Sequence, residues 1–190
     1  MNRTIHLTSE YIEKAYQLMT FVRNHLPEDE KHFLRTKSLT DLFGHHARGD
    51  LMLGVETPSG QLIGLLIAQP TGIPAITPAF NFGTGTTLVQ SVCIHPDHTG
   101  SGQVRALFDH LEDWAKHHQG VTHLHAKVST QNVKSLVVFA KLGFSVIHRG
   151  HDPERNYEAI ILEKQVPPLA QTALFPSNTG HDFAPAAAGC

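Results

Sequence analysis

The sequence has little cysteine, no long apolar run and almost no net charge, and each shortage excludes a class of protein. Its 190 residues include two cysteines, Cys93 and Cys190, which are too few for a disulfide framework and fit a reducing compartment. No apolar run reaches the about 18 residues of a membrane span. The N-terminal segment also has no apolar stretch of signal-peptide length. We therefore predict a cytoplasmic protein that does not bind a membrane.

Charge of either sign is not in excess. Fifteen Lys and Arg face seventeen Asp and Glu, for a formal net charge of −2, which argues against a nucleic-acid partner. Histidine is abundant, with 15 residues. His123 and His125 would share one face of a strand, but no third ligand stands at metal spacing. We expect a pH-sensitive histidine surface and no metal.

Hydrophobic periodicity predicts a chain in which strands and helices alternate, an α/β (α+β) class. Helices are predicted over residues 9–22, 27–46, 104–116 and 131–142. Strands are predicted over residues 3–7, 50–56, 61–69, 88–94, 122–128, 144–148 and 157–163. Residues 70–85 form a loop rich in Pro, Gly and Thr.

The C-terminal segment differs in composition from the rest. Residues 165–190 contain no Lys or Arg, one acid (Asp182) and four prolines. Such a segment cannot bury enough apolar surface to offset the entropy of ordering it. We expect a folded domain over residues 1–164 and a loose tail over 165–190.

The segment from His95 to Val104 joins a buried strand to an amphipathic helix through a turn with two glycines, Gly100 and Gly102. Glycines allow a tight turn, and the N–H groups at a helix N-terminus attract anions. Arg105 stands where a dinucleotide-type turn needs glycine, and no Gly-Lys pair marks a P-loop. The turn therefore predicts either an anion site of another kind or simply a tight connection.

This stretch resembles a signature of the GNAT acetyltransferase superfamily, a strand, an R/Q-x-x-G-x-G/A turn and a helix. Thr99 stands in place of Arg or Gln, and Val104 in place of the closing Gly or Ala. A second stretch resembles the family's N-x-x-A-x-x-x-Y-x-K-x-G-F signature through Asn132, Ser135, Phe139, Lys141, Gly143 and Phe144. The element order over residues 3–164 is similar too. The resemblance implies a mixed, mostly antiparallel sheet of six to seven strands flanked by about four helices.

The resemblance also implies an acetyl-CoA site. The backbone N–H groups of the turn would hold the pyrophosphate, and the strand edge would hydrogen-bond the pantetheine arm. Asn132 would lie beside that arm, and Phe139 near the thioester. The implied cofactor-binding residues are Val92, Cys93, Ile94, Thr99, Gly100, Ser101, Gly102, Gln103, Val104, Asn132 and Phe139.

The implied activity is transfer of acetyl from acetyl-CoA to a primary amine of a small molecule or peptide. The amine would attack directly, with backbone N–H groups near Val92 polarising the carbonyl. Exposed sheet edges in such folds often pair into homodimers. Phe139 replaces a Tyr that is common in the family and proposed as proton donor. The alternative is therefore an acyl-CoA-binding regulatory or catalytically impaired module.

The general base is left open by the sequence. The strand over residues 88–94 has no carboxylate. The acids that qualify are Glu10, Glu56 and the cluster Glu28–Glu30. His95 is a weaker candidate, which would relay a proton through water, and its simpler interpretation is a solvated turn histidine. The acceptor would enter between residues 9–48 and the 70–85 loop.

Overall fold

The computed structural model describes residues 2–34, 37–70, 85–118, 120–153 and 155–167. Within these ranges, seven strands occupy Arg3–His6 (β1), Leu51–Glu56 (β2), Leu62–Pro70 (β3), Thr86–Ile94 (β4), His123–Ser129 (β5), Ser145–Asp152 (β6) and Tyr157–Gln165 (β7). The described residues also form four α-helices, at Ile12–Asn24 (α1), Leu39–Ala47 (α2), Gln103–His117 (α3) and Val133–Lys141 (α4). Short 3-10 helices cover Ser9–Tyr11, Glu28–Phe33 and Pro96–His98.

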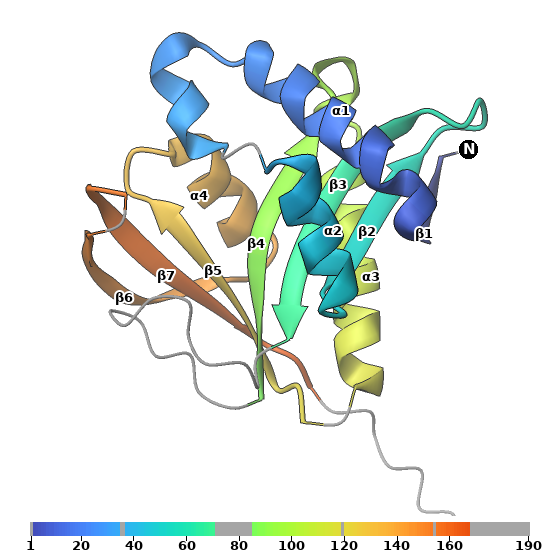
Figure 1. The fold of residues 1–190 in the computed structure, drawn as a ribbon. Helices are drawn as coiled ribbons and strands as arrows, with labels where there is room; N and C mark the ends of the chain where they lie inside the picture. Colours follow the sequence, from blue (N-terminus) through green and yellow to red (C-terminus); the bar gives the residue numbers. More distant parts are fainter. Residues whose placement is uncertain (1, 35–36, 71–84, 119, 154, 168–190) are drawn as a thin grey trace, which may run out of the picture.

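The strands form a single sheet in the order β1-β2-β3-β4-β5-β7-β6. Every neighbouring pair is antiparallel except β4 and β5, which are parallel. This arrangement confirms the expected mixed, mostly antiparallel sheet. A parallel neighbour requires a crossover between its strands, and α3 provides it here, on one face of the sheet (Figure 1).

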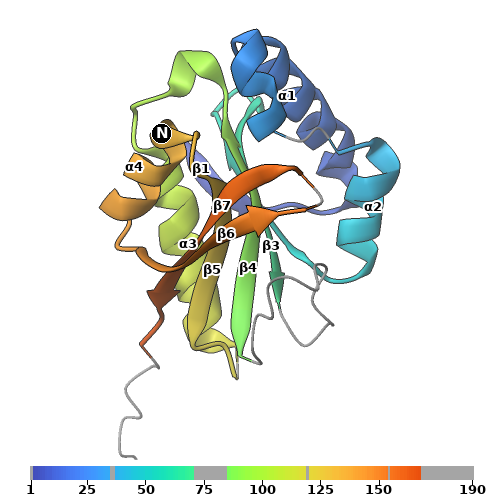
Figure 2. The ribbon, with the colours of Figure 1, turned by 90° about the vertical axis from the view of Figure 1, so that its left-hand side faces the viewer.

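Helices cover both faces of the sheet, α1 and α2 on one and α3 and α4 on the other (Figure 2). Two apolar clusters match these layers. Leu107, Phe108 and Leu111 of α3 pack with Phe139 of α4 in the larger cluster. The second cluster lies under α1 and α2 and includes Met19. Burying each such side chain contributes about 1.5–3 kcal/mol, so the sheet is held rigidly from both sides.

The helix predicted over residues 27–46 is wrong. The structure places a 3-10 helix at Glu28–Phe33, an extended Leu34, and then α2 from Leu39. Ser38 is extended and accepts a hydrogen bond from the backbone N–H of Asp41, whose carboxylate in turn accepts from the backbone N–H of Ser38. This capping box starts a new helix and separates it from the acidic turn before it.

Two predicted segments fall largely outside the described residues. They are the 70–85 loop, of which Pro70 and Gly85 are described, and the tail, of which residues 165–167 are described. Val166 is 2% exposed and packs in the larger cluster, so the folded domain extends at least to this residue. Within the described ranges, no helix combines the length and the apolar character needed to cross a lipid bilayer.

Candidate functional site

The strands β4 and β5 part halfway along their length. They pair only from Thr86–Val89 to His123–Ala126, and the rest of each strand has no partner in the other. The two ribbons diverge beyond this point (Figure 1). Residues 90–94 of β4 therefore have one strand edge, facing β5, that carries backbone donors and acceptors without a strand to satisfy them.

The register of β4 decides which backbone groups face this opening. The backbone N–H of His95 donates to the carbonyl of Ile63 at 2.8 Å, so His95 points toward β3. Since antiparallel residues alternate, Cys93 also directs its backbone groups to β3, whereas Val92 and Ile94 direct theirs to the opening. Of the three predicted strand residues, two therefore present backbone groups there.

A β-bulge lies where the strands part. Ile67 pairs with Ser91 and Ala68 with Val89, which leaves Gln90 of β4 without a partner in β3. The extra residue changes which way the backbone faces on either side of it, and bulges often re-aim groups at functional sites. The Gln90 side chain donates to Gln69 and is buried in part.

The glycine turn leads from β4 to the N-terminus of α3. Gly100 and Gly102 have φ of 75° and 83°, which favour glycine, and a Cβ on either would meet nothing within 4 Å. Gly102 is the N-cap of α3 and has no side chain to cap it, and the first turn carries no acid. The N–H groups at this end lack intrahelical acceptors. The turn thus fits an anion held by backbone N–H groups.

The structure removes one residue from the predicted anion-binding set at this turn. The N–H of Thr99 donates to the carbonyl of Pro96 at 3.2 Å, within the preceding 3-10 turn. The hydroxyl of Ser101 donates to the carbonyl of His98. Arg105 donates to the carbonyl of Lys141 at 3.0 Å and so ties the start of α3 to the end of α4. The N–H groups that suit an external anion are those of Gly100 to Val104.

A cavity of about 210 Å³ lies where β4 and β5 part. Asn132 and Phe139, both predicted site residues, line it along with Val92. Asn132 caps α4 by accepting from the N–H of Ser135 at 3.1 Å. Phe139 is 7% exposed and contacts Phe108 and Phe144 edge to face. Phe139 therefore forms an apolar wall shared with the core.

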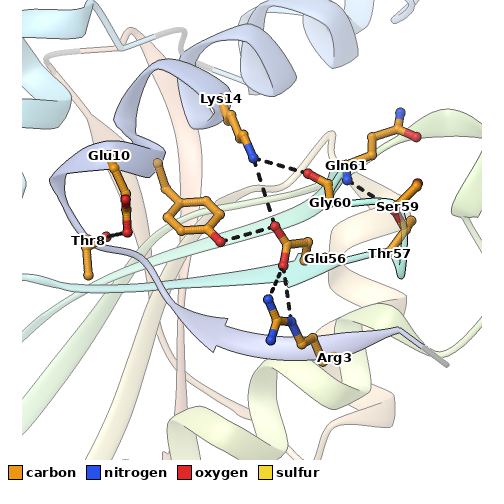
Figure 3. A network of polar contacts seen from close by, with 10 residues as sticks. Arg3, Thr8, Glu10, Lys14, Glu56, Thr57, Ser59, Gly60 and Gln61 are labelled. Atoms are coloured by element: carbon orange, nitrogen blue, oxygen red, sulfur yellow. Dashed lines mark hydrogen bonds and ion pairs between the residues drawn. The ribbon is translucent and has the colours of Figure 1, made fainter.

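The candidate bases do not line this cavity. Glu56 lies near the other edge of the sheet, where it accepts from Arg3 at 2.7 Å and Tyr11 at 3.1 Å, with Lys14 nearby (Figure 3). The Arg3 hydrogen bond, with that of Tyr11, holds the pKa of Glu56 below its ordinary value despite desolvation. Glu56 is thus a paired structural carboxylate.

The three remaining glutamates are also engaged elsewhere. Glu10 accepts from the hydroxyl of Thr8, Glu28 from Lys31, and Glu30 from Lys134 of α4. None of these acids is among the described residues that line the cavity.

His95 is not a solvated turn histidine, and that interpretation is wrong. Its side chain is 12% exposed, and its ring stacks on Phe21 of α1 with centroids 4.6 Å apart. The Nδ1 atom accepts from the N–H of Asp97 at 3.3 Å. His95 is not among the cavity-lining residues either.

Burial raises the pKa of the Cys93 thiol to about 12. The nucleophile of cysteine chemistry is the thiolate, which is therefore scarce here at neutral pH. The side chain lies in the cluster under α1 and α2. Cys93 thus behaves as a small apolar core residue.

The residues that line the cavity and that sequence reasoning missed include four long polar side chains: Lys37, Lys127, Arg155 and Tyr157. Lys127 pairs with the fully buried Asp152 at 2.7 Å, and Arg155 donates to the Tyr157 hydroxyl at 3.3 Å. Lys127 lies between the buried Ala126 and Val128 on β5, and a charged residue between two apolar ones is the one sequence signal that marks it. The others belong to turns and strand ends without a pattern.

Comparison with known proteins finds a matching family and solved structures of the same fold. The model of the acetyltransferase (GNAT) family matches residues 11–144. The ribosomal-protein-S18-alanine N-acetyltransferase of Escherichia coli has a TM-score of 0.66 and 19% identity, covering 92% of this chain and 99% of that one. YncA of Salmonella typhimurium, solved with its cofactor acetyl-CoA, has a TM-score of 0.63 and 20% identity over 99% of both chains.

A third similar structure is the ribosomal-protein-alanine N-acetyltransferase of Brucella melitensis. Its TM-score is 0.62 at 17% identity, and the match covers 86% of this chain and 99% of that one. No curated protein matches the sequence. At these identities the solved structures establish a shared fold.

Proposed function

Because the chain belongs to the GNAT acetyltransferase family, we propose that it transfers the acetyl group of acetyl-CoA to a primary amine. The acceptor is a small molecule or a peptide N-terminus or side chain. Acetyl-CoA supplies an activated thioester, so the chain itself has only to bind, orient and handle protons. No covalent acyl-enzyme is required, in line with the buried thiol of Cys93.

In this proposal the opening between β4 and β5 holds the cofactor. The N–H groups of Gly100 to Val104 bind the pyrophosphate at the positive end of α3. The free backbone edge at Val92 and Ile94 pairs with the pantetheine arm as an added strand does. Asn132 borders the arm, and Phe139 closes the apolar side of the cavity.

The chemistry needs a polarised carbonyl and a proton donor. In this proposal the backbone N–H groups of β4 beside the bulge at Gln90 donate to the carbonyl oxygen of the thioester. These hydrogen bonds stabilise the negative charge that develops on that oxygen. The Tyr157 hydroxyl takes the role of proton donor to the leaving sulfur, which Phe139 cannot fill. It lines the same cavity and accepts a hydrogen bond from Arg155.

The observation that carries the proposal is the parting of β4 and β5 next to the uncapped N-terminus of α3. Calorimetric titration of the full chain with acetyl-CoA tests it, and no binding at millimolar concentration would refute it. Thiol release followed across a panel of amines then separates enzyme from module. Tight binding without release for any amine favours the acyl-CoA-binding module.

A further inference from the structure

The connection between β6 and β7 brings an arginine to the cavity. Asp152 and Tyr157 pair with each other in the two strands, so the turn lies between these residues. Arg155 lines the cavity together with Tyr157, and it is exposed. Its guanidinium donates to the Tyr157 hydroxyl at 3.3 Å. A cation therefore lies beside the hydroxyl that is proposed to protonate the leaving sulfur.

The turn is fixed in place by contacts at both of its ends. Asp152 is fully buried, and its carboxylate lies 2.7 Å from Nζ of Lys127 on β5. The backbone N–H of Arg155 donates to the carbonyl of Asp152 at 3.3 Å. Asn156 has φ of 52°, a left-handed conformation that Asn adopts more readily than most other residues with a side chain. This local geometry holds Arg155 next to Tyr157.

Arg155 has hydrogen-bond donors to spare. A guanidinium carries several N–H donors in a fixed fork and keeps its charge at any pH of interest. Within the described residues its side chain makes one hydrogen bond, to the neutral Tyr157 hydroxyl, and no ion pair. The remaining fork matches the two oxygens of a carboxylate. No Asp or Glu is among the described residues that line the cavity, so the arrangement suits an anion brought by a ligand.

The face of the sheet separates this arginine from the proposed pyrophosphate site. Ile160 and Leu162 of β7 pack in the larger apolar cluster, beneath α3 and α4 (Figure 2). Since side chains alternate along a strand, Tyr157 lies on the opposite face, which α1 and α2 cover. The acceptor is expected on that side, next to residues 9–48. The anion that Arg155 suits is therefore carried by the acceptor rather than by CoA.

We infer that the acceptor is a free amino acid whose carboxylate binds to Arg155. This inference rests on the proposed function for its acetyl donor. Arg155 lies one hydrogen bond from the Tyr157 hydroxyl, which in that proposal contacts the sulfur next to the carbon under attack. The amine and the anion of the acceptor are then only a few bonds apart, as they are in an amino acid. A peptide N-terminus has no carboxylate there, because the peptide bond has consumed it.

The transfer balances with these groups. The ammonium of the amino acid loses a proton to solvent, and the freed electron pair of the nitrogen forms a bond to the thioester carbonyl carbon. The C–S bond breaks, the sulfur leaves with its electron pair, and the Tyr157 hydroxyl gives it a proton. The nitrogen returns its surplus proton to the Tyr157 oxygen. The products are an N-acetylamino acid and the CoA thiol, and the carboxylate on Arg155 is unchanged.

Arg149 of β6 is a matched control for Arg155. It is exposed and belongs to the same hairpin, but it lies opposite Ile160 and so on the face of α3 and α4. It is not among the described residues that line the cavity. Arg149→Gln and Arg155→Gln remove the same charge from neighbouring positions. A general effect of charge should appear in both variants, whereas loss of a carboxylate contact should appear in Arg155→Gln alone.

The test is thiol release from acetyl-CoA with a panel of free amino acids and their carboxamides. A carboxylate favours the charged form of a neighbouring amine, so the carboxamide has more of its amine neutral and a preference for the acid must come from binding. We expect the wild type to prefer the acid. Arg155→Gln should lower this preference in kcat/KM about 30-fold, mainly through KM, which is the size of a charged hydrogen-bond contribution. Arg149→Gln should leave the preference unchanged.

Three results would overturn the inference. The first is a wild type that does not prefer the acid. The second is an equal loss of kcat for acid and carboxamide in Arg155→Gln, since this would mean that Arg155 only positions Tyr157. The third is a loss of acetyl-CoA affinity by calorimetry in the same variant, which would assign the arginine to the cofactor. Arg155→Lys keeps the charge without the fork and should recover part of the preference.

Binding of a product separates this inference from the proposed function. Calorimetry with N-acetylleucine and N-acetylleucinamide measures the carboxylate contact without any transfer. Acid binding that Arg155→Gln abolishes, in a chain that releases no thiol with any amine, would support the anion site and overturn the transfer. Thiol release without a preference for the acid would overturn the inference alone. Failure of both measurements would overturn both proposals.

Discussion

The two ends of β4 differ in how their backbone hydrogen-bonding groups are paired. From Thr87 to Val89 the strand is paired on both edges, to β3 and β5, and two of these three residues are buried. From Gln90 to Ile94 it is paired on one edge at most, and Cys93 is the single buried residue. The paired end holds the sheet together, whereas the open end offers backbone groups to a ligand. Changes at one end should therefore affect stability and changes at the other should affect binding.

The largest expected effect is the loss of acetyl-CoA affinity in Gly102→Asp. A carboxylate at the N-cap of α3 repels an anion by about 4 kcal/mol, near a thousandfold in affinity. Asp and Asn are the residues other than glycine that most readily adopt a positive φ, so the helix should remain. Calorimetry with acetyl-CoA measures the loss. Gly102→Asn has the same positive φ without the charge and should lose far less, and equal losses would refute the anion site.

At the paired end, Leu124→Ala should lower the free energy of unfolding by about 3 kcal/mol. Leu124 is fully buried, lies opposite Thr87 and belongs to the larger apolar cluster. Urea denaturation measures the change. Acetyl-CoA affinity of the folded variant should stay the same, and a parallel fall in affinity would show that the two ends are not independent.

Tyr157→Phe sharpens the comparison within the open end, since it should change chemistry without changing binding. Loss of a proton donor lowers turnover by about 100-fold. The ring still fills its place in the cavity, so acetyl-CoA affinity should hold. Thiol release measured with the best amine of the panel gives kcat. Unchanged kcat would assign the proton to another donor.

Thr87→Val should stabilise the fold, whereas the substitutions above weaken binding, stability or turnover. The Thr87 hydroxyl is fully buried in the paired end and has no hydrogen-bond partner among the described residues. An unsatisfied buried hydroxyl destabilises the fold, so an apolar side chain of similar shape should raise the free energy of unfolding by about 1 kcal/mol. Chemical denaturation checks the sign, and destabilisation would reveal a partner for the hydroxyl.

The smallest effect belongs to a network away from both ends. Glu56 has a lowered pKa in the folded chain through Arg3 and Tyr11. Its stabilising effect is therefore present above the ordinary glutamate pKa of about 4.3 and is lost as the pH falls through the lowered value. Unfolding curves of the wild type and Glu56→Gln should converge in acid. A gap that persists at low pH would contradict this origin, and acetyl-CoA affinity should not change.

The sequence predicted much of the local structure at the site. The apolar run at 88–94 and the amphipathic pattern at 104–116 gave β4 and α3 within two residues of their bounds. Gly100 and Gly102 marked the turn between them, because positive φ needs glycine. The split of residues 27–46 into two helices depended on Ser38 and Asp41, whose capping pattern overrode a weak periodicity.

Other parts of the site could not be predicted from local sequence patterns. Lys37, Lys127 and Tyr157 lie far apart in sequence and meet because β4 and β5 diverge. The bulge at Gln90 depends on the register with β3. Contacts of this kind arise from twist and register, which neighbouring residues do not encode.

The sequence by itself determined most of the elements, the glycine turn and the family resemblance, because periodicity, capping and φ requirements act between residues close in the chain. The tertiary structure decided where β4 and β5 part, which edge of β4 faces the opening, and which side chains line the cavity. It also decided that Glu56 pairs with Arg3 and that His95 stacks on Phe21. Proximity between distant residues depends on how the layers pack, and only the folded chain fixes that.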